Sequence, residues 1–328
     1  MNIAIVILNW NGKSLLEQFL PSVVKYSKEA KVYVADNAST DNSISFIKAN
    51  YPNVTILENA KNGGYAKGYN DALKQVKEPI YCLLNSDIEV TENWLKPIEE
   101  EFSNEENTAI IQPKILDYKK KSHFEYAGAA GGFVDALGYP YCRGRIFNTI
   151  EVDENQYKSD TVFWASGACL FIRKSVFNEL NGFDESYFAH YEEIDLCWRA
   201  FNLGYITKYN QDSIVYHVGG ATLNASNPKK TELNFRNSLF TLVKNVKGLL
   251  LLLVFIRLAL DGVAGIKFLL EFKPKHTFAI IKAHFSFYIA LPKLLKQRKS
   301  LQQKKGYYGL KSVVYSYFIQ KKRFFNQF

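Results

Sequence analysis

Short apolar runs alternate with segments of helical spacing through the first part of the chain. The apolar runs predict strands at residues 3–8, 31–35, 54–57, 80–84 and 109–112. Between them, the spacing of apolar residues predicts helices at 13–27, 41–50, 66–77 and 92–102. Because strands that alternate with helices are typical of βα units, this pattern predicts a wound α/β domain around a mainly parallel sheet.

A different pattern begins after about residue 115, where the alternation lapses into a polar, glycine-rich stretch. Beyond it the sequence predicts a strand at 161–164, a turn at Ser166–Ala168, a strand at 169–172 and a short helix at 174–180. In the next predicted helix, Ile194, Cys197, Trp198 and Phe201 recur at i, i+3, i+4 and i+7 and form one buried stripe, which Gly204 ends.

The composition is that of a folded protein with a large core. Hydrophobic residues make up 47% and charged residues 22% of 328 residues, which suggests about two domains and excludes a disordered or fibrous chain. The four cysteines form no C-x-x-C pair, so we expect a reducing compartment. No basic segment precedes the apolar run at 3–8, and we therefore expect a strand there, no signal peptide, and a cytoplasmic protein.

Charge divides the chain after Pro228. Residues 229–328 contain 20 Lys and Arg but 3 acidic residues, a balance of +17, whereas residues 1–228 have a balance of −8. A basic tail of this kind can bind nucleic acid. This one also contains an apolar run at 249–256 and scattered aromatic residues, which suit an anionic membrane better, and we expect no nucleic-acid partner.

The apolar segment 248–272 is the candidate for membrane contact. Arg257, Asp261 and Lys267 interrupt it, so we expect a helix or helix pair that lies in the headgroup region of the bilayer. A membrane span and a helical cap packed on the catalytic domain are the alternatives. We therefore divide the chain into a catalytic domain, 1–228, and a basic helical membrane-associating region, 229–328.

Polar residues at the strand ends carry the candidate chemistry, because open α/β sheets bind ligands at the carboxyl ends of their strands. Asp36 follows one strand and can accept a hydrogen bond from a pyrimidine base, or it is a turn residue. The Gly63-Gly64 pair allows a close backbone approach at a helix start, where an anion can bind, although a glycine pair is more often turn chemistry.

A metal site is the interpretation we favour for Asp87 and His217. Asp87 ends the strand at 80–84, and a hard cation such as Mg²⁺ or Mn²⁺ that bridges two phosphates prefers oxygen ligands. His217 follows a strand-like run and is the candidate for a further ligand. The alternatives are a capping aspartate and a histidine with a purely structural role.

Glu192 and Glu193 open the helix that carries the apolar stripe. The helix dipole favours ionised carboxylates in a first turn, and an ionised carboxylate can serve as a base. Asp195 and Arg199 are four residues apart and lie away from the stripe, which indicates an ion pair on the helix surface. We therefore prefer Glu193 as the base.

The ordered motifs of residues 1–240 resemble those of the inverting glycosyltransferases of family 2, which have the GT-A fold, and most closely their rhamnosyltransferase-like bacterial branch. The matching segments are ILNWNG (7–12), ADNASTDNS (35–43), NGGYAKGYN (62–70), LLNSD (83–87), WASGACLFIRK (164–174), GFDESYFAHYEEIDLCWRA (182–200), YHVGGAT (216–222) and RNSLF (236–240). The resemblance implies a GT-A type wound mixed sheet flanked by helices, followed by the basic, partly apolar helical region.

The resemblance also implies roles for particular residues. Asp87 would be the last residue of the metal-binding D-x-D motif, whose first position here is Asn85, and the ion would be Mg²⁺ or Mn²⁺. The family takes its base from the second member of a Glu-Asp pair, which here is Glu193, with Glu192 and Asp195 as its neighbours. The implied substrate-binding residues are Asn9, Asp36, Asn62, Gly64, Lys67, Asn70, Trp164, Ser166 and Gly167.

The activity expected from the resemblance is transfer of a sugar with inversion at the anomeric carbon. The donor would be dTDP-rhamnose or another UDP- or dTDP-linked sugar, and the acceptor a lipid-linked glycan of surface polysaccharide synthesis. We expect an enzyme that is cytoplasmic and peripheral on the inner face of the cell membrane. A dinucleotide-binding or nucleotidyl-transfer protein is disfavoured because the first strand has no G-x-G-x-x-G turn. The remaining rival is a non-catalytic subunit that binds nucleotide or glycan.

Overall fold

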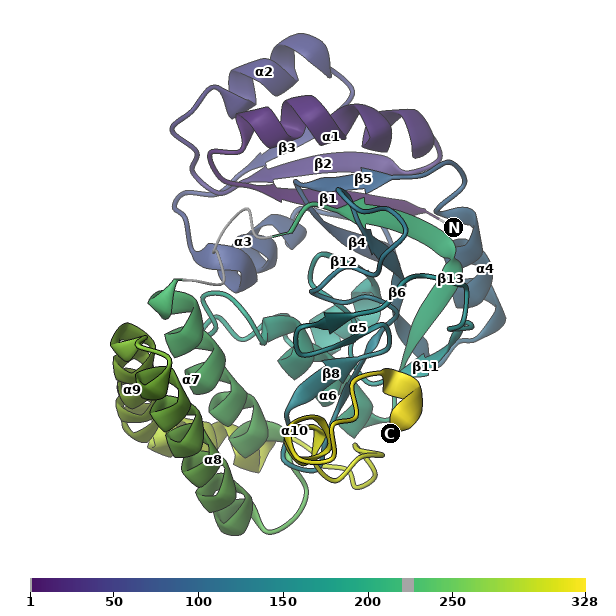
Figure 1. Ribbon diagram of the computed structural model, residues 1–328. Coiled ribbons are helices and arrows are strands. Elements are labelled where there is room, and N and C mark those ends of the chain that lie inside the picture. Colours follow the sequence, from purple (N-terminus) through teal and green to yellow (C-terminus); the bar gives the residue numbers. More distant parts are fainter. Residues whose placement is uncertain (1, 220–226) are drawn as a thin grey trace.

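A nine-stranded mixed sheet is the centre of the computed structural model, which describes residues 2–219 and 227–328 (Figure 1). The strand order is β11 (Asp160–Val162), β13 (Ile206–His217), β6 (Thr108–Asp117), β12 (Cys169–Arg173), β4 (Ile80–Asn85), β1 (Ile3–Asn9), β2 (Lys31–Asp36) and β3 (Thr55–Glu58), with β5 (Ile88–Val90) paired to β13. Strands β1 to β4 are parallel, while β12 is antiparallel to β4 and β6. The wound mixed sheet implied by the resemblance is confirmed, but the mainly parallel sheet predicted from the apolar pattern is not, because β5, β11 and β12 pair in the antiparallel direction.

Helices cover both faces of this sheet because successive strand residues point to opposite sides. Ile3, Ile5 and Ile7 belong to a buried cluster with α1 (Lys13–Tyr26), α2 (Ser43–Asn50) and α4 (Lys96–Asn104). Ala4 and Val6 belong to a second cluster, shared with α3 (Gly64–Leu73), α5 (Lys174–Glu179) and α6 (Glu192–Leu203). The helices predicted between the strands are therefore present, with their ends shifted by a few residues.

The polar, glycine-rich stretch folds into a small four-stranded sheet that the sequence pattern did not reveal. Its order is β10 (Thr149–Ile150), β9 (Arg145–Ile146), β8 (Pro140–Cys142) and β7 (Gly132–Val134). Strands of two or three residues are too short to show an alternating pattern. The strand predicted at 161–164 ends at Val162, so Trp164 lies beyond it.

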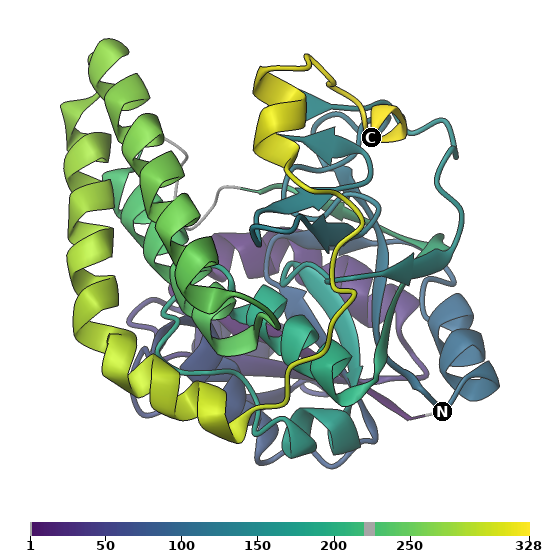
Figure 2. The same cartoon turned by 90° about the horizontal axis from the view of Figure 1, so that it is seen from below.

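Three long helices follow the nine-stranded sheet and pack side by side (Figure 1). They are α7 (Pro228–Asn245), α8 (Leu250–Leu270) and α9 (Pro274–Ser300), and α8 is one continuous helix. Figure 2 shows the chain running back from the end of α9 along the underside of the molecule to the small sheet, through α10 (Val313–Phe318) and a 3₁₀ turn (Phe325–Gln327). Tyr307 fastens this segment by donating its hydroxyl to the carbonyl oxygen of Ala136 at 2.7 Å.

The change of charge after Pro228 does not coincide with a gap in the packing. Helix α7 contacts α6, and its Lys244 ammonium group lies 2.9 Å from the Asp195 carboxylate of α6. Leu239 and Val243 of α7 are buried in a cluster with Phe287 of α9. The helices that follow residue 228 are thus packed onto the elements that carry the candidate site.

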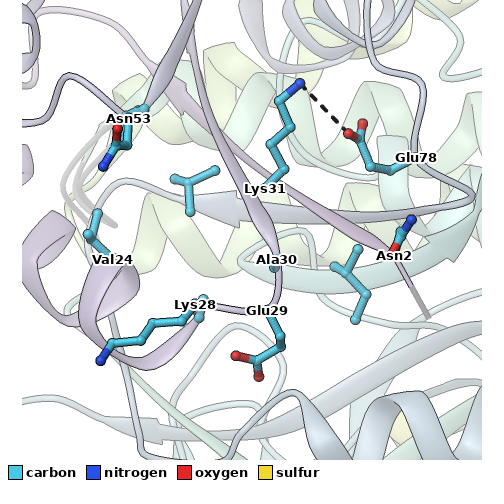
Figure 3. A pocket seen from close by; sticks show the side chains of 12 residues that line it. Asn2, Val24, Lys28, Glu29, Ala30, Lys31, Asn53 and Glu78 are labelled. Atoms are coloured by element: carbon cyan, nitrogen blue, oxygen red, sulfur yellow. Dashed lines mark ion pairs between the residues drawn. The ribbon is translucent and has the colours of Figure 1, made fainter.

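A cavity of about 610 Å³ lies at the amino ends of the parallel strands (Figure 3). It is lined by Asn2 next to β1 and by Lys31 of β2, whose ammonium group lies 3.9 Å from the Glu78 carboxylate. This is the opposite edge of the sheet from Asn9 and Asp36, at the carboxyl ends. The cavity is therefore not part of the site predicted from the strand ends.

Candidate active site

Asn9 and Asp36 lie side by side at the carboxyl ends of β1 and β2, where the parallel register pairs them. The Asn9 amide donates to the Asp36 carboxylate at 3.0 Å and to the Ser39 hydroxyl at 3.2 Å, and the backbone N–H of Ser39 donates to the other Asp36 oxygen at 2.9 Å. The Asn9 Oδ1 atom is buried without a hydrogen-bond partner. Both side chains predicted to bind substrate are thus held rigidly at one strand edge.

Amide side chains fasten the loop at residues 62–70 to this edge. The Asn37 amide donates to Asn62 Oδ1 at 2.9 Å and to the Gly64 carbonyl oxygen at 3.1 Å. Gly64 has a φ of +79°, and a Cβ there would lie 2.4 Å from the carbonyl oxygen of Phe188. Glycine is therefore required at this position for the close approach of two loops. Asn37 and its partner Asn59 were not singled out from the sequence.

Lys67 and Asn70 contact the segment that leads to α6. The Asn70 amide donates to the Phe183 carbonyl oxygen at 2.8 Å and accepts from the Phe183 backbone N–H at 2.9 Å. Lys67 forms ion pairs with Asp71 at 2.8 Å and with Glu185 at 3.6 Å. Asn70 thus braces the loop against this segment, and the nucleotide contact that the resemblance implied for Lys67 and Asn70 stays a prediction.

The turn at residues 166–168 joins the end of β4 to the acidic pair of α6. On one side, the Asn85 backbone N–H donates to the Ala168 carbonyl oxygen at 2.9 Å. On the other side, a Cβ at Gly167 would lie 3.8 Å from the Cβ of Glu193. Tyr65 completes the junction by donating its hydroxyl to the Gly167 carbonyl oxygen at 2.7 Å. Tyr65 lies in a quoted motif, but sequence reasoning gave it no role.

Trp164 and Ser166 support this turn from inside the molecule. Trp164 is 2% exposed, and its indole N–H donates to the Phe133 carbonyl oxygen at 2.9 Å. The backbone N–H of Ser166 donates to the buried Gln112 side chain at 2.8 Å. Trp164 and Ser166 are covered by neighbouring side chains, and Gly167 is the partly exposed residue of the three, so the sugar contact implied for these residues stays a prediction.

Asp87 and His217 meet beside the pairing of β5 with β13. The His217 Nε2 atom lies 3.2 Å from Asp87 Oδ1, and Nδ1 lies 3.4 Å from the carboxylate of Glu125 without forming an aligned hydrogen bond. Burial lowers the pKa of His217, but the two carboxylates outweigh burial and raise this pKa to about 10. Glu125, which comes from the glycine-rich stretch, was missed because no motif marks it.

Asp87 and His217 fit a divalent cation whose remaining ligands are water and substrate phosphate. Within residues 2–219 and 227–328, no three His, Cys, Asp or Glu side chains converge tightly enough to enclose a metal ion. Mg²⁺ is commonly bound through one or two carboxylates and completes its shell with water and substrate phosphates. Asp87 supplies one such carboxylate. His217 would join it only as a neutral imidazole, after losing the proton that Asp87 and Glu125 favour, and its Nδ1–H would then face Glu125.

Glu192 and Glu193 form a crowded acidic pair at the start of α6. The Oε2 atom of each carboxyl is buried without a hydrogen-bond partner. Burial raises the pKa of Glu193 to about 7, and burial together with the charge of Glu193 raises the pKa of Glu192 well above its ordinary value. A carboxyl with a pKa near 7 is well matched to taking up a proton at neutral pH. The preference for Glu193 therefore agrees with its environment.

The ion pair of Asp195 with Arg199 is buried, and our expectation of a surface pair is wrong. Asp195 is fully buried, and its carboxylate accepts from Arg199 at 2.8 Å and lies 2.9 Å from the Lys244 ammonium group. Burial would raise the pKa of Asp195, but these two cations outweigh it and lower the pKa. The surface prediction failed because α7 covers this side of α6. Asp195 is thus a fixed anion, and Glu193 is the better candidate for the base.

The family model described as Glycosyl transferase family 2 matches residues 4–180, more than half of the chain. The chain belongs to glycosyl transferase family 2. The matched segment contains the carboxyl ends of β1, β2 and β4, and with them the residues that hold the 166–168 turn. The non-catalytic alternative gains no support from this match.

Relatives of this family 2 glycosyltransferase include enzymes of glycan assembly. One is the N-acetylglucosaminyl-diphospho-decaprenol L-rhamnosyltransferase of Mycobacterium tuberculosis, 26% identical over 65% of this chain and 75% of the relative. Another is the low-salt glycan biosynthesis hexosyltransferase Agl10 of Haloferax volcanii, 25% identical over 61% of each chain. The chain is accordingly similar to enzymes of glycan assembly, and its family makes it a glycosyltransferase.

Solved glycosyltransferases share its fold. The mannosyltransferase PcManGT of Pyrobaculum calidifontis, in complex with GDP-Man and Mn²⁺, is 12% identical and has a TM-score of 0.56 over 87% of this chain and 86% of its own. GalNAc-T7 with UDP, GalNAc and Mn²⁺ is 17% identical and has a TM-score of 0.58 over 74% of this chain, which spans 48% of GalNAc-T7. The fold is therefore GT-A.

Proposed function

We propose that this glycosyltransferase transfers a sugar, with inversion, from a dTDP- or UDP-linked donor to a lipid-linked glycan of surface polysaccharide synthesis. The best candidate for the donor is dTDP-rhamnose. The observation that carries the proposal is the 166–168 turn, which has the strand end that leads to Asp87 on one side and Glu193 on the other. Such a turn can receive a sugar between a diphosphate and a base.

On the donor side, we assign the nucleoside to the edge formed by Asn9 and Asp36. The Oδ1 atom of Asn9 is buried at this edge without a hydrogen-bond partner, so a small local opening would expose an acceptor to the nucleoside. The diphosphate would lie near Asp87 and His217, the residues that would hold a divalent cation. Such a cation neutralises the charge of a departing diphosphate, and this charge stabilisation is the chemistry that it supplies when bound.

On the acceptor side, Glu193 takes the proton of the attacking hydroxyl group. The acceptor oxygen forms a bond to the anomeric carbon while the bond from that carbon to the diphosphate oxygen breaks. The proton stays on the Glu193 carboxyl, and the electron pair leaves with the nucleoside diphosphate. Because there is a single displacement, the anomeric configuration is inverted. Asp195 is already paired with two cations and keeps its charge throughout.

The C-terminal helices support a lipid-linked acceptor and a position on the inner face of the cell membrane. Both α8 and α9 expose large apolar side chains, with Leu251 85% and Ile289 80% exposed. Lys293, Lys296 and Lys299 are exposed at the end of α9. Apolar side chains next to basic ones suit a peripheral contact with anionic lipid. The acceptor of the Mycobacterium relative, by its name, carries a decaprenol diphosphate.

The test is a transfer assay with the purified full chain, Mn²⁺, and dTDP-rhamnose or UDP-sugars. The acceptor is a polyprenyl-diphosphate N-acetylglucosamine in detergent, and NMR of the product gives its anomeric configuration. We expect transfer with inversion, and a loss of about 100-fold or more in Glu193→Gln. A product of retained configuration would contradict the mechanism. Donor binding without transfer to any acceptor would instead support a non-catalytic binding subunit.

A further inference from the structure

The segment that precedes Glu192 has an unfavourable backbone conformation. His190 and Tyr191 have φ angles of 69° and 73°, so two consecutive non-glycine residues lie in the left-handed region. Such residues persist only where the surrounding structure holds them. Tyr191 is also the residue whose carbonyl oxygen accepts the backbone N–H of Asp195 at 2.9 Å, in the first turn of α6. The position of this strained segment therefore sets the position of Glu192 and Glu193.

Asn237 of α7 holds this segment through its backbone. Its side-chain amide donates to the carbonyl oxygens of Ala189 and His190, at 2.9 and 2.8 Å. Asn237 is fully buried, and its Oδ1 atom accepts from the Arg236 guanidinium at 2.8 Å, which fixes the orientation of the amide. A single amide thus bonds to one left-handed residue, His190, and to Ala189, which directly precedes the left-handed pair.

Other polar residues of α7 face the same loop. Thr241 and Lys244 follow Asn237 at i+4 and i+7 and so lie on one face of the helix. The Thr241 hydroxyl lies 2.9 Å from the Tyr187 hydroxyl, and the Lys244 ammonium group lies 2.7 Å from the Asp184 carboxylate. This face of α7 is accordingly a scaffold for residues 184–191, and Asn237 is the member that bonds to the backbone of Ala189 and His190.

We infer that Asn237 is a positioning residue for the base: it holds the backbone at residues 189–191 so that Glu193 stays beside the 166–168 turn with its Oε2 atom shielded from water. The inference rests on the proposed role of Glu193. Without the two amide bonds, the segment can relax out of the left-handed region and the first turn of α6 can move. More water then reaches the Glu193 carboxyl, its pKa falls, and the carboxylate becomes a weaker base.

The experiment compares Asn237→Leu, which keeps the side-chain size but loses both donors, with Thr241→Val, which removes a bond from the same helix face to the same loop. In wild type and both variants, kcat and KM for the donor are measured from pH 5 to 9. For Asn237→Leu we expect the acidic limb to move down by about one pH unit and kcat to fall about tenfold or more, with donor KM nearly unchanged. For Thr241→Val we expect kcat to fall at acidic pH with the same apparent pKa as in wild type.

A stability measurement tests the same inference without activity. Glycine adopts a positive φ freely, so in His190→Gly the left-handed backbone at position 190 should depend less on the hydrogen bonds from Asn237. We expect the milder change Asn237→Ser to lower the melting temperature less in the His190→Gly background than in wild type. If wild type shows no transfer, the proposed function fails while this cycle still tests the contact. An unmoved acidic limb in Asn237→Leu, or equal losses from Asn237→Ser in both backgrounds, would overturn the inference.

Discussion

Glu193 and Asp195 stand two residues apart on one helix but differ in what surrounds their carboxylates. Asp195 is bonded to Arg199 and lies against Lys244, whereas Glu193 has a buried oxygen without a partner and another carboxyl beside it. Cations favour the ionised form, and burial without a partner favours the protonated form. One acidic residue is therefore a structural anion, and the other can exchange a proton near neutral pH.

The half-buried Glu193 carboxyl, with its shielded Oε2 atom, should make the protein less stable as the pH rises. Its pKa is about 7 in the folded state and near 4.5 in the unfolded state, so the folded protein holds a proton that the unfolded chain releases between these values. Stability from this group falls as the pH rises through that window. We expect Glu193→Gln to gain about 2 kcal/mol relative to wild type between pH 5 and pH 8.

Urea unfolding of the two proteins at both pH values measures this gain. Wild type and Glu193→Gln should have closer unfolding free energies at pH 5 than at pH 8. A difference between them that is the same at both pH values would mean that the Glu193 carboxyl is not destabilised by its surroundings.

Several site residues could be predicted because their chemistry is local to the sequence. Asn9, Asp36 and Asp87 follow apolar strands, and the carboxyl ends of parallel strands lie at one edge. Tyr65 and Glu125 could not be found in this way. Their roles depend on contacts with Gly167 and His217, which are far away in the chain and meet them only through the tertiary fold.

At the scale of elements, helix α7 explains why the Asp195–Arg199 ion pair was predicted correctly but its exposure to solvent was not. The i, i+4 spacing of Asp195 and Arg199 did predict their ion pair, but the pattern of α6 alone does not tell what packs against it. The polar stripe of α7, with Lys244 and Asn245 bonded to Asp195, converts that side of α6 into an interface. Long amphipathic elements were predictable, whereas the short strands β7 to β10 were not.

The buried cation Lys244 should be important for stability. Replacing it with methionine keeps most of the side-chain volume but leaves Asp184 and Asp195 without their shared partner. Removing one partner of a buried ion pair costs about 3–5 kcal/mol, so we expect Lys244→Met to lose that much in urea unfolding.

Lys247, which is exposed three residues later, supplies the matched control. The same substitution there should change the unfolding free energy by less than about 0.5 kcal/mol. Equal effects of Lys244→Met and Lys247→Met would show that the buried ion pairs of Lys244 do not stabilise the protein more than an exposed lysine does.

For the whole molecule, the basic part of the chain, residues 229–328, is also the part whose long helices expose large apolar side chains. Among the residues that the structure describes, α9 is the one helix long and apolar enough to cross a membrane, and 28% of its most apolar stretch is buried. The segment singled out from the sequence became α8, whose interrupting residues Arg257 and Asp261 are buried against the rest of the protein. These two charges thus point inward, whereas the third, Lys267, is exposed beside the apolar side chains of the outer surface.

This exposed face predicts binding to anionic vesicles. We expect the pair of substitutions Phe255→Glu and Ile289→Glu to weaken sedimentation with phosphatidylglycerol-containing vesicles about tenfold or more, because each places a charge where an apolar group would enter the lipid. Ile150→Glu, an exposed apolar position outside the helices α7 to α9, is the control and should bind like wild type. Equal binding of all three proteins would exclude these helices as the membrane contact.

The most direct test of the central claim is the pH dependence of kcat/KM for transfer in wild type and Glu193→Asp. The account predicts that kcat/KM of wild type falls about tenfold per pH unit below a pKa near 7, because protonated Glu193 cannot accept the hydroxyl proton. Glu193→Asp should keep an acidic limb but with a changed pKa and a lower maximum. An identical limb and maximum in both proteins would show that another group takes the proton, and would contradict the account.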